Sequence, residues 1–214
     1  MQPVNATENL GHKAAIRQEN ERLILDAAEV VFAEQGFKGA TTSKIAEQAN
    51  MPKANVHYYF PTKEKLYRRV IEDICDTWLE SANLFDDSSD PAEALEGYIN
   101  AKMDLSRQRP LGSRIWANEM IRGAQFTGDY IAKNVKDWLE GRITVIQSWI
   151  EEGKIDPIDP RILMYMIWAT TQHYADFGQQ IKILNENNSL SDTQFDQAKK
   201  MVVTIILKGV GANK

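Results

Sequence analysis

Residues 41–60, which read TTSKIAEQANMPKANVHYYF, constrain the fold more than any other part of the chain. Thr41 and Thr42 can cap a helix, because a hydroxyl accepts a hydrogen bond from a backbone N–H that lacks a partner in the first turn. Asn50 tolerates the left-handed conformation that a tight turn requires. Pro52 suits the opening of a second helix, where its missing N–H costs nothing. The segment therefore predicts two short helices joined by a tight turn, a helix-turn-helix.

The second of these helices, KANVHYYF, is expected to have two distinct faces. Val56 and Phe60 lie four residues apart and can both face inward. Tyr59 could belong to either face. The outer face is expected to carry cationic, amide and aromatic groups: Lys53, Asn55, His57 and Tyr58. A short helix with such an outer face suits the major groove of DNA.

Two kinds of DNA contact are expected from this region. Asn55 and His57 are the candidates for reading base edges. The candidates for contacts to the phosphate backbone are cationic or hydroxyl side chains: Thr42, Lys53, Tyr58 and Lys63. The charge distribution agrees, because residues 37–69 hold seven basic and two acidic residues, whereas the whole chain carries a net −5. A local basic patch on an acidic protein predicts that DNA contacts one end of the molecule only.

This region resembles the DNA-binding domain of the TetR family of transcriptional regulators. Upstream, ILDAAEVVFAEQGFKGATT is similar to the family's first helix, its closing glycine and the start of the second helix. Downstream, FPTKEKLYRRVI is similar to the start of the fourth helix. Pro52 stands where the family usually carries Ser, and Asn50 where Gly is common, and both are compatible with the turn. The resemblance implies a regulator that binds a double-stranded DNA operator.

Composition and helix signals indicate an ordinary helical protein. Of 214 residues, 43% are hydrophobic and 26% are charged. No stretch alternates with a two-residue period, so we predict an all-α fold of about nine helices. Beyond the DNA-binding region these helices span roughly 63–84, 91–108, 111–121, 128–152, 159–184 and 191–209. We expect three parts: a flexible arm over 1–16, a DNA-binding domain over 17–65, and an effector-binding and dimerisation domain over 66–214.

Several features indicate a cytoplasmic protein. The dense apolar run at 162–169 is shorter than the roughly 20 residues that span a bilayer. The N-terminal residues lack the apolar core of a secretory signal. Cys75 is the single cysteine, which excludes an internal disulfide and fits a reducing compartment. We expect Cys75 to be a small buried side chain rather than a redox switch.

The last two helices are unusually apolar. Residues 162–171 are apolar nearly all round, and the final helix carries five aliphatic residues: Val202, Val203, Ile205, Ile206 and Leu207. A monomer of this size has difficulty burying both helices. In the TetR family the two C-terminal helices form a four-helix dimer interface, so the resemblance implies a homodimer through these helices. We expect Ile206 to lie in that interface.

Enzyme motifs such as GxxxxGK[ST], GxSxG, HExxH and GxGxxG are absent from the sequence. His173 and Asp176 form an HxxD pair on one helical face, which could bind a metal or orient a base. The favoured interpretation is a satisfied polar pair within an apolar helix. We therefore expect no enzyme, no catalytic residue, no metal and no cofactor.

The segment MIWATTQHYADF, residues 166–177, is the candidate for a ligand site. Trp168 and Gln172 lie four residues apart and share a face, and Thr171 and Tyr174 add hydroxyl groups. A Trp ring beside an amide suits a small planar ligand, because the ring stacks and the amide both donates and accepts hydrogen bonds. A packed core with a buried polar network would produce the same pattern, and periodicity leaves both interpretations open.

A narrower resemblance favours the ligand site. The segments GKIDPIDPRILMYMIWATTQHYADF and LSRQRPLGSRIWANEM are similar to the pyrimidine-utilisation regulators within the TetR family. This resemblance implies a repressor that uracil or thymine releases from DNA, with Trp78, Trp168 and Gln172 at the ligand. A different small metabolite, or a protein partner, remains the alternative.

Overall fold

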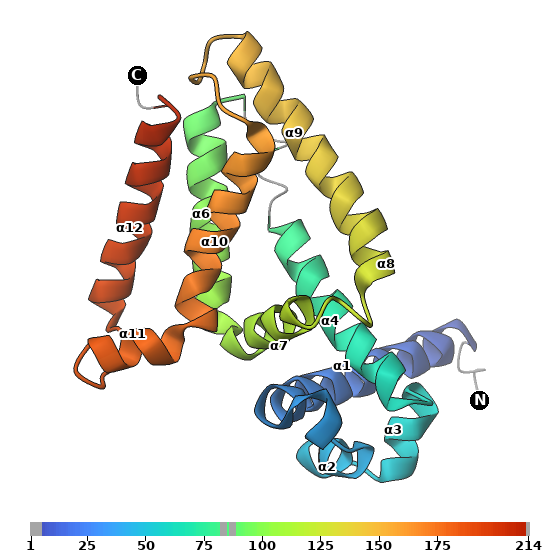
Figure 1. Cartoon of the computed structure of the whole chain (residues 1–214). Coiled ribbons are helices and arrows are strands. Elements are labelled where there is room, and N and C mark those ends of the chain that lie inside the picture. Colours follow the sequence, from blue (N-terminus) through green and yellow to red (C-terminus); the bar gives the residue numbers. More distant parts are fainter. Residues whose placement is uncertain (1–5, 82–84, 86–88, 213–214) are drawn as a thin grey trace. The chain divides into compact units, whose positions relative to one another are not determined.

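The computed structural model describes residues 6–81, 85 and 89–212, and all its regular elements in these ranges are helices (Figure 1). The all-α prediction is confirmed. The chain divides after Ile71 into two compact units. This division falls inside a helix, a few residues beyond the boundary expected from the sequence.

The first unit contains the predicted helix-turn-helix. Its helices are α1 (Ala6–Gly39), α2 (Thr42–Gln48), α3 (Lys53–Tyr59) and the start of α4 (Lys63–Glu80). The Thr41 hydroxyl accepts a hydrogen bond from the Lys44 backbone N–H at 3.2 Å, which caps α2 as predicted. Asn50 has a φ of 52° in the turn between α2 and α3. Local capping and turn chemistry therefore set the angle at which α3 leaves α2.

A small apolar core supports α3. The buried residues of α1 share one face of that helix: Ile24, Ala27, Ala28, Val31 and Phe32. Ile45 of α2 and Val56 of α3 are fully buried. The Phe32 and Tyr67 rings meet edge to face with centroids 4.9 Å apart, which joins α1 to α4. This packing holds α3 with its inner face covered and its outer face open.

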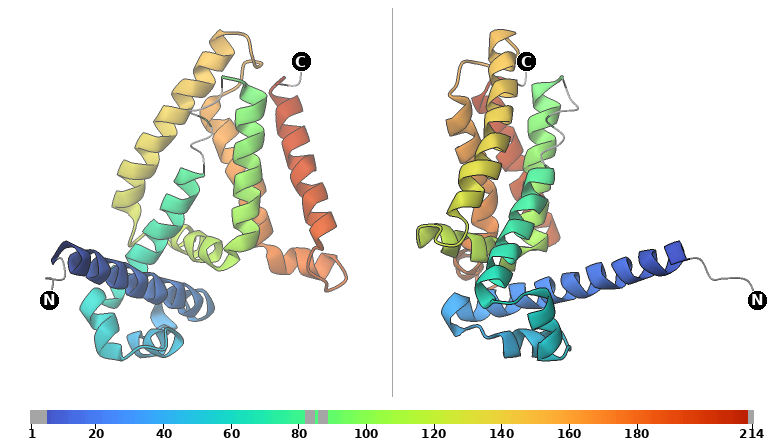
Figure 2. Two further views of the ribbon diagram at one scale, coloured as in Figure 1. Left: turned by 180° about the vertical axis from the view of Figure 1, so that it is seen from behind. Right: turned by 90° about the vertical axis from the view of Figure 1, so that its right-hand side faces the viewer.

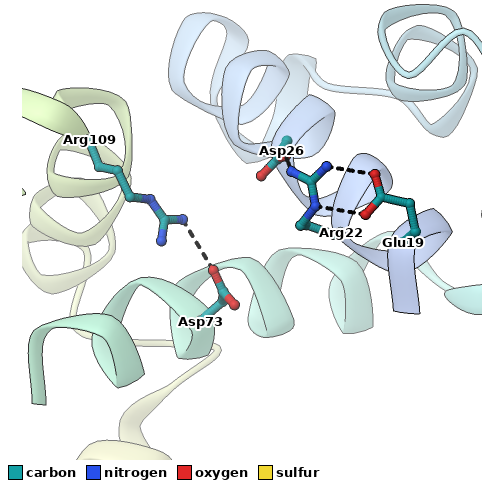
Figure 3. Close-up of polar contacts among 5 residues, drawn as sticks. All are labelled: Glu19, Arg22, Asp26, Asp73 and Arg109. Carbon is teal, nitrogen blue, oxygen red and sulfur yellow. Dashed lines mark hydrogen bonds and ion pairs between the residues drawn. The ribbon is translucent and has the colours of Figure 1, made fainter. Parts of the chain in front are cut away.

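Helix α1 begins earlier than predicted but breaks at the predicted glycine. It begins at Ala6, within the segment predicted as a flexible arm, and residues 1–5 lie outside the described residues. Every side chain from 12 to 19 is exposed, and this part of α1 extends beyond α2 and α3 (Figure 2). Local interactions support it, such as the Arg22 guanidinium, which pairs with Glu19 at 2.7 Å and Asp26 at 2.9 Å (Figure 3). At the other end, Gly36 breaks the helix with a φ of 66°.

The second unit contains the remaining helices. They are α6 (Pro91–Gln108), α7 (Pro110–Ile121), α8 (Gly128–Tyr130), a π-helical stretch η1 (Ile131–Val135), α9 (Lys136–Glu151), α10 (Pro160–Asp176), α11 (Gly178–Leu184) and α12 (Asp192–Gly209). Asp90 caps α6, and Ser191 with Gln194 forms a capping box at the start of α12. The helix predicted over 159–184 is two helices, because Phe177 leaves the helical conformation between α10 and α11.

Helix α6 lies at the centre of the second unit and packs against α10 and α12 (Figures 1 and 2). The Ser106 hydroxyl lies 2.9 Å from the carbonyl oxygen of Thr171 and so links α6 to α10. The Arg109 guanidinium at the α6–α7 junction pairs with Asp73 of α4 at 3.2 Å (Figure 3). These contacts fix α4, α6 and α10 against one another within the unit.

One prediction about α12 is wrong. Ile206 is 7% exposed and belongs to the apolar core of the second unit, rather than to an outer face. The neighbouring Ile205 is 61% exposed. Two adjacent helical positions point about 100° apart, so only the packing of α12 on α6 decides which of them is covered. No described helix has both the length and the apolar character needed to cross a membrane.

Candidate DNA interface and ligand cavity

The outer face of α3 presents the predicted DNA-reading residues. Val56 and Phe60 are buried as predicted. The outward side chains are all exposed: Lys53, Asn55, His57 and Tyr58. Lys53, Asn55 and His57 make no side-chain hydrogen bond to any described residue. Their donors and acceptors are therefore available to a partner.

The other residues proposed to lie near DNA or on either face of α3, Thr42, Tyr59 and Lys63, have different surroundings within the first unit. Thr42 is half-buried at the first position of α2. The Tyr59 hydroxyl accepts a hydrogen bond from the Asn20 amide at 3.3 Å, so Tyr59 packs towards α1. The Lys63 ammonium donates to the backbone carbonyls of Phe37 at 2.8 Å and Ala40 at 3.0 Å. Lys63 therefore ties the end of α1 to the start of α4, an internal role that the sequence did not indicate.

The second unit holds a small cavity between α4, α6, α7 and α10. Its lining is mostly aromatic and apolar: Cys75, Trp78, Leu79, Tyr98, Lys102, Trp116, Val135, Trp168 and Gln172. The space open to the centres of water molecules is about 50 Å³. Trp78, Trp168 and Gln172 were all proposed from the sequence as ligand contacts, and the structure brings them to this one cavity. Cys75 is buried as expected, and burial raises the pKa of its thiol to about 12.

The polar groups of the cavity are only partly paired. The Trp168 indole N–H donates to the Tyr98 hydroxyl at 2.8 Å. Trp168 therefore has its ring face, but no free N–H, for a ligand. The Gln172 side chain lines the cavity, and its amide makes no hydrogen bond to any described residue. Gln172 is half-buried, so its amide can form hydrogen bonds with a ligand or with water in the cavity.

Lys102 is the main residue that the sequence analysis missed. It is 3% exposed, and its ammonium lies 4.3 Å from the centroid of the Trp78 ring. Burial lowers the pKa of Lys102 to about 8, against the opposing effect of the nearby Cys75 and Asp176. A signal was present in the sequence, because Lys102 repeats at helical spacing with Leu95, Tyr98 and Ile99 on the apolar face of α6.

Two of the predicted ligand residues lie elsewhere. Thr171 is fully buried, and its hydroxyl donates to the carbonyl oxygen of Ile167 at 2.7 Å. Tyr174 lines a different, open groove along α10 and α11, where its ring packs against Phe195. On α10, positions 171 and 174 point away from the face that carries Trp168 and Gln172. The structure therefore places neither hydroxyl in the cavity.

The HxxD pair on α10 forms no catalytic arrangement. Asp176 accepts a hydrogen bond from the Ser113 hydroxyl at 2.5 Å, whereas the His173 ring stacks on Phe177. Burial raises the pKa of Asp176, and the Ser113 hydrogen bond opposes that rise. Among the described residues, no cluster of His, Cys, Asp or Glu is placed to hold a metal ion.

Comparison with known proteins agrees with this architecture. Residues 24–70 match the family model described as bacterial regulatory proteins, tetR family. Residues 71–213 match the model described as YcdC-like protein, C-terminal region. The chain belongs to the TetR family. It is therefore a DNA-binding transcriptional regulator, and its relatives are regulators rather than enzymes.

Among curated relatives, the HTH-type transcriptional regulator RutR of Escherichia coli strain K12 is 36% identical over 205 residues. The match covers 96% of this chain and 97% of RutR. TetR-type structures share the fold at lower identity. The ketosteroid transcriptional regulator KstR2 of Mycobacterium tuberculosis has a TM-score of 0.71 at 21% identity, covering 89% of this chain and 94% of KstR2. AibR, in complex with isovaleryl coenzyme A and operator DNA, has a TM-score of 0.69 at 19% identity, covering 87% and 97%.

Proposed function

We propose that this TetR-family regulator is a homodimeric cytoplasmic repressor that a pyrimidine base, uracil or thymine, releases from its operator. The observation that carries this proposal is the meeting of Trp78, Trp168 and Gln172 in one cavity. The similarity to RutR, which extends over nearly the whole of both chains, supports it.

The size of the cavity favours a small ring over larger metabolites. A space of about 50 Å³ for water centres corresponds to roughly three to five water molecules at about 10–15 Å³ each. A ketosteroid or an acyl coenzyme A, the compounds named for KstR2 and for AibR, is far larger than this space. Unless the surrounding helices move apart, the part of the ligand that enters this space must be compact.

The proposed ligand contacts divide between stacking and pairing. The Trp168 ring face stacks on the base, because its N–H already serves Tyr98. The Gln172 amide pairs with the polar edge of the base by one donated and one accepted hydrogen bond. The half-buried Trp78 contributes an aromatic wall from α4. This arrangement satisfies the amide that has no partner in the described residues.

Helix α4 provides the route from ligand to DNA-binding domain. It carries Lys63 at its start and Trp78 near its end, so one helix belongs to both units of the chain. A ligand shifts the conformational equilibrium only if it binds one arrangement better than another. We propose that the base favours an arrangement of α4 in which the two α3 helices of the dimer no longer match successive half-sites.

The proposed dimer interface lies on the outer faces of α10 and α12. Large apolar side chains on these faces are exposed: Ile162, Tyr165 and Met166 on α10, with Met201 and Ile205 on α12. An apolar surface of this kind typically marks an interface. A homodimer covers both faces by two-fold symmetry and presents two copies of α3 to a two-fold symmetric operator.

A second candidate is a regulator controlled by a protein partner. Ile183 and Leu184 of α11 are 56% and 78% exposed, beyond the faces of α10 and α12. Their substitution by Ser tests this candidate, because it should abolish regulation while leaving pyrimidine binding intact. If both properties survive, α11 has no such role.

Calorimetry on Gln172→Leu tests the pyrimidine proposal. The substitution keeps the bulk of the side chain and removes both hydrogen-bonding groups, so uracil binding should fall at least about tenfold. Gln147→Leu on the exposed face of α9 is the matched control and should bind uracil normally. If the unaltered protein shows no heat with either base, the pyrimidine proposal is wrong. If Gln172→Leu binds uracil normally, the ligand lies elsewhere.

A further inference from the structure

The Lys102 ammonium is a buried positive charge that has no hydrogen-bond acceptor among the residues that the structure describes. Its side chain is 3% exposed and lines the cavity, and its ammonium lies 4.3 Å from the centroid of the Trp78 ring. No described residue accepts a hydrogen bond from it. Taking an ammonium out of water is costly unless hydrogen bonds replace the lost hydration, and the face of one aromatic ring does so only in part.

The Tyr98 hydroxyl is a second buried donor that lacks an acceptor among the described residues. The Tyr98 hydroxyl, 1% exposed, accepts from Trp168 and donates to no described residue. Together with Gln172, the cavity therefore offers more donors than acceptors. The Asp176 carboxylate, which acts electrostatically on Lys102, accepts from the Ser113 hydroxyl and does not line the cavity.

We propose that Lys102 determines the specificity of this cavity by requiring a ligand oxygen, a carbonyl or a carboxylate, that accepts a hydrogen bond from its ammonium. This inference rests on the proposed function and names the feature by which the site selects its ligand. A ring with two carbonyl oxygens can accept hydrogen bonds from both Lys102 and Tyr98, and its ring N–H can donate to the Gln172 oxygen. A ring that carries an amino group in place of one carbonyl leaves a cavity donor facing another donor.

Lys102 also excludes a cationic ligand, which the aromatic walls of the cavity alone would suggest. Three Trp rings, from Trp78, Trp116 and Trp168, line the cavity, and such aromatic cages commonly bind quaternary ammonium groups. Lys102 already places a cation against Trp78. A second cation would be repelled by it at short range in a poorly hydrated space.

Calorimetry with four probes on three proteins tests this inference. The probes are uracil, thymine, cytosine and benzoate, and the proteins are the unaltered chain, Lys102→Met and Lys136→Met. Methionine keeps most of the length of lysine without its charge or donors. Lys136 is exposed on α9 and provides the control. The unaltered protein and Lys136→Met should bind uracil and thymine alike, and cytosine at least about tenfold more weakly. Lys102→Met should bind uracil at least about tenfold more weakly than the unaltered protein, and it should no longer prefer uracil to cytosine.

The outcomes separate this inference from the proposed effector. If uracil binds the unaltered protein and Lys102→Met equally well, the role of Lys102 is wrong and the pyrimidine proposal stands. If benzoate binds through Lys102 whereas uracil and thymine do not, the pyrimidine proposal fails and the role of Lys102 stands. If none of the oxygen-bearing probes binds the unaltered protein, both are wrong. Should Lys102→Met not fold, Lys102→Leu replaces it, with the same losses expected because the charge and the hydrogen-bond donors are again absent.

Discussion

The Trp168 indole N–H donates a hydrogen bond to the Tyr98 hydroxyl at 2.8 Å, across the boundary between α10 and α6. This bond fixes the plane of the Trp168 ring against the cavity. Because the N–H is already used, recognition of polar ligand atoms falls to Gln172, Lys102 and the remaining hydrogen of Tyr98.

Removal of the Tyr98 hydroxyl should therefore loosen the cavity wall. Tyr98→Phe leaves the Trp168 N–H without an acceptor in a half-buried position, which should lower the free energy of unfolding by about 1–3 kcal/mol. Chemical denaturation without DNA measures this change, and Tyr58→Phe on the exposed face of α3 is the control. Equal stability of the two variants would mean that the hydrogen bond has no net effect.

Lys102 should make the free energy of unfolding depend on pH. Its pKa is about 8 in the folded chain against an ordinary value of 10.5, so between these values the unfolded chain holds a proton that the folded chain has lost. The unfolded state binds more protons, and stability should therefore rise with pH across this window, by up to about 3 kcal/mol. The thiol of Cys75 opposes this rise, because burial raises its pKa from 9.0 to about 12, so above about pH 9 the unfolded chain loses a proton that the folded chain keeps. The contribution of Lys102 is therefore isolated by comparing the unaltered protein with Lys102→Met, since both retain Cys75.

The measurement is the difference between the unaltered protein and Lys102→Met in denaturation experiments at several pH values. Cys75 and the Asp176 carboxylate are the titratable groups that act on Lys102, and both proteins retain them. Saturating uracil should make the difference in stability between the two proteins less dependent on pH, because a ligand oxygen would keep Lys102 charged. A difference that is independent of pH without ligand would contradict the low pKa.

Neighbouring residues of α12 should respond in opposite ways to the same substitution. Ile205→Glu places a charge on the exposed face, so the chain should fold but give monomers by light scattering and lose operator affinity. Ile206→Glu places a carboxylate in the core, which costs several kcal/mol, so it should unfold the second unit. A stable dimer of Ile205→Glu would place the interface elsewhere.

Two residues of α3 should separate base reading from phosphate contact. Asn55→Ala should reduce the difference in binding free energy between operator and non-specific DNA by about 1–3 kcal/mol, which is the contribution of a paired base contact. Lys53→Ala should weaken both by similar amounts and reduce the salt dependence of binding by about one counterion. Titrations on both DNAs at several salt concentrations measure these effects. An unchanged difference would remove Asn55 from the base-reading residues.

Lys63→Ala supplies the contrast within the same domain. Its ammonium holds two backbone carbonyls, so the first effect of its loss should be lower thermal stability, rather than weaker binding of all sequences. Operator titrations well below the unfolding temperature separate the two effects. Full stability with uniformly weaker DNA binding would restore the phosphate role that the sequence indicated.

The sequence alone determined the features that depend on neighbours along the chain. Thr41 and Asn50 act within two or three residues, and the structure has the cap and the turn where the pattern predicted them. The caps of α6 and α12 by Asp90 and Ser191 are equally local. The i, i+4 spacing likewise placed Trp168 and Gln172 on one face of α10.

Only the tertiary structure decided contacts between residues far apart in the chain. The cavity joins residues of α4, α6 and α10, with Tyr98 and Trp168 seventy positions apart. Which side of α12 is covered, what Lys63 holds and what Lys102 faces depend on how whole helices pack. A helical repeat shows that a residue lies on an apolar face, but not which side chain lies opposite. The role of Lys102 on such a face therefore depends on the Trp78 ring that packs against it, a contact that the sequence does not show.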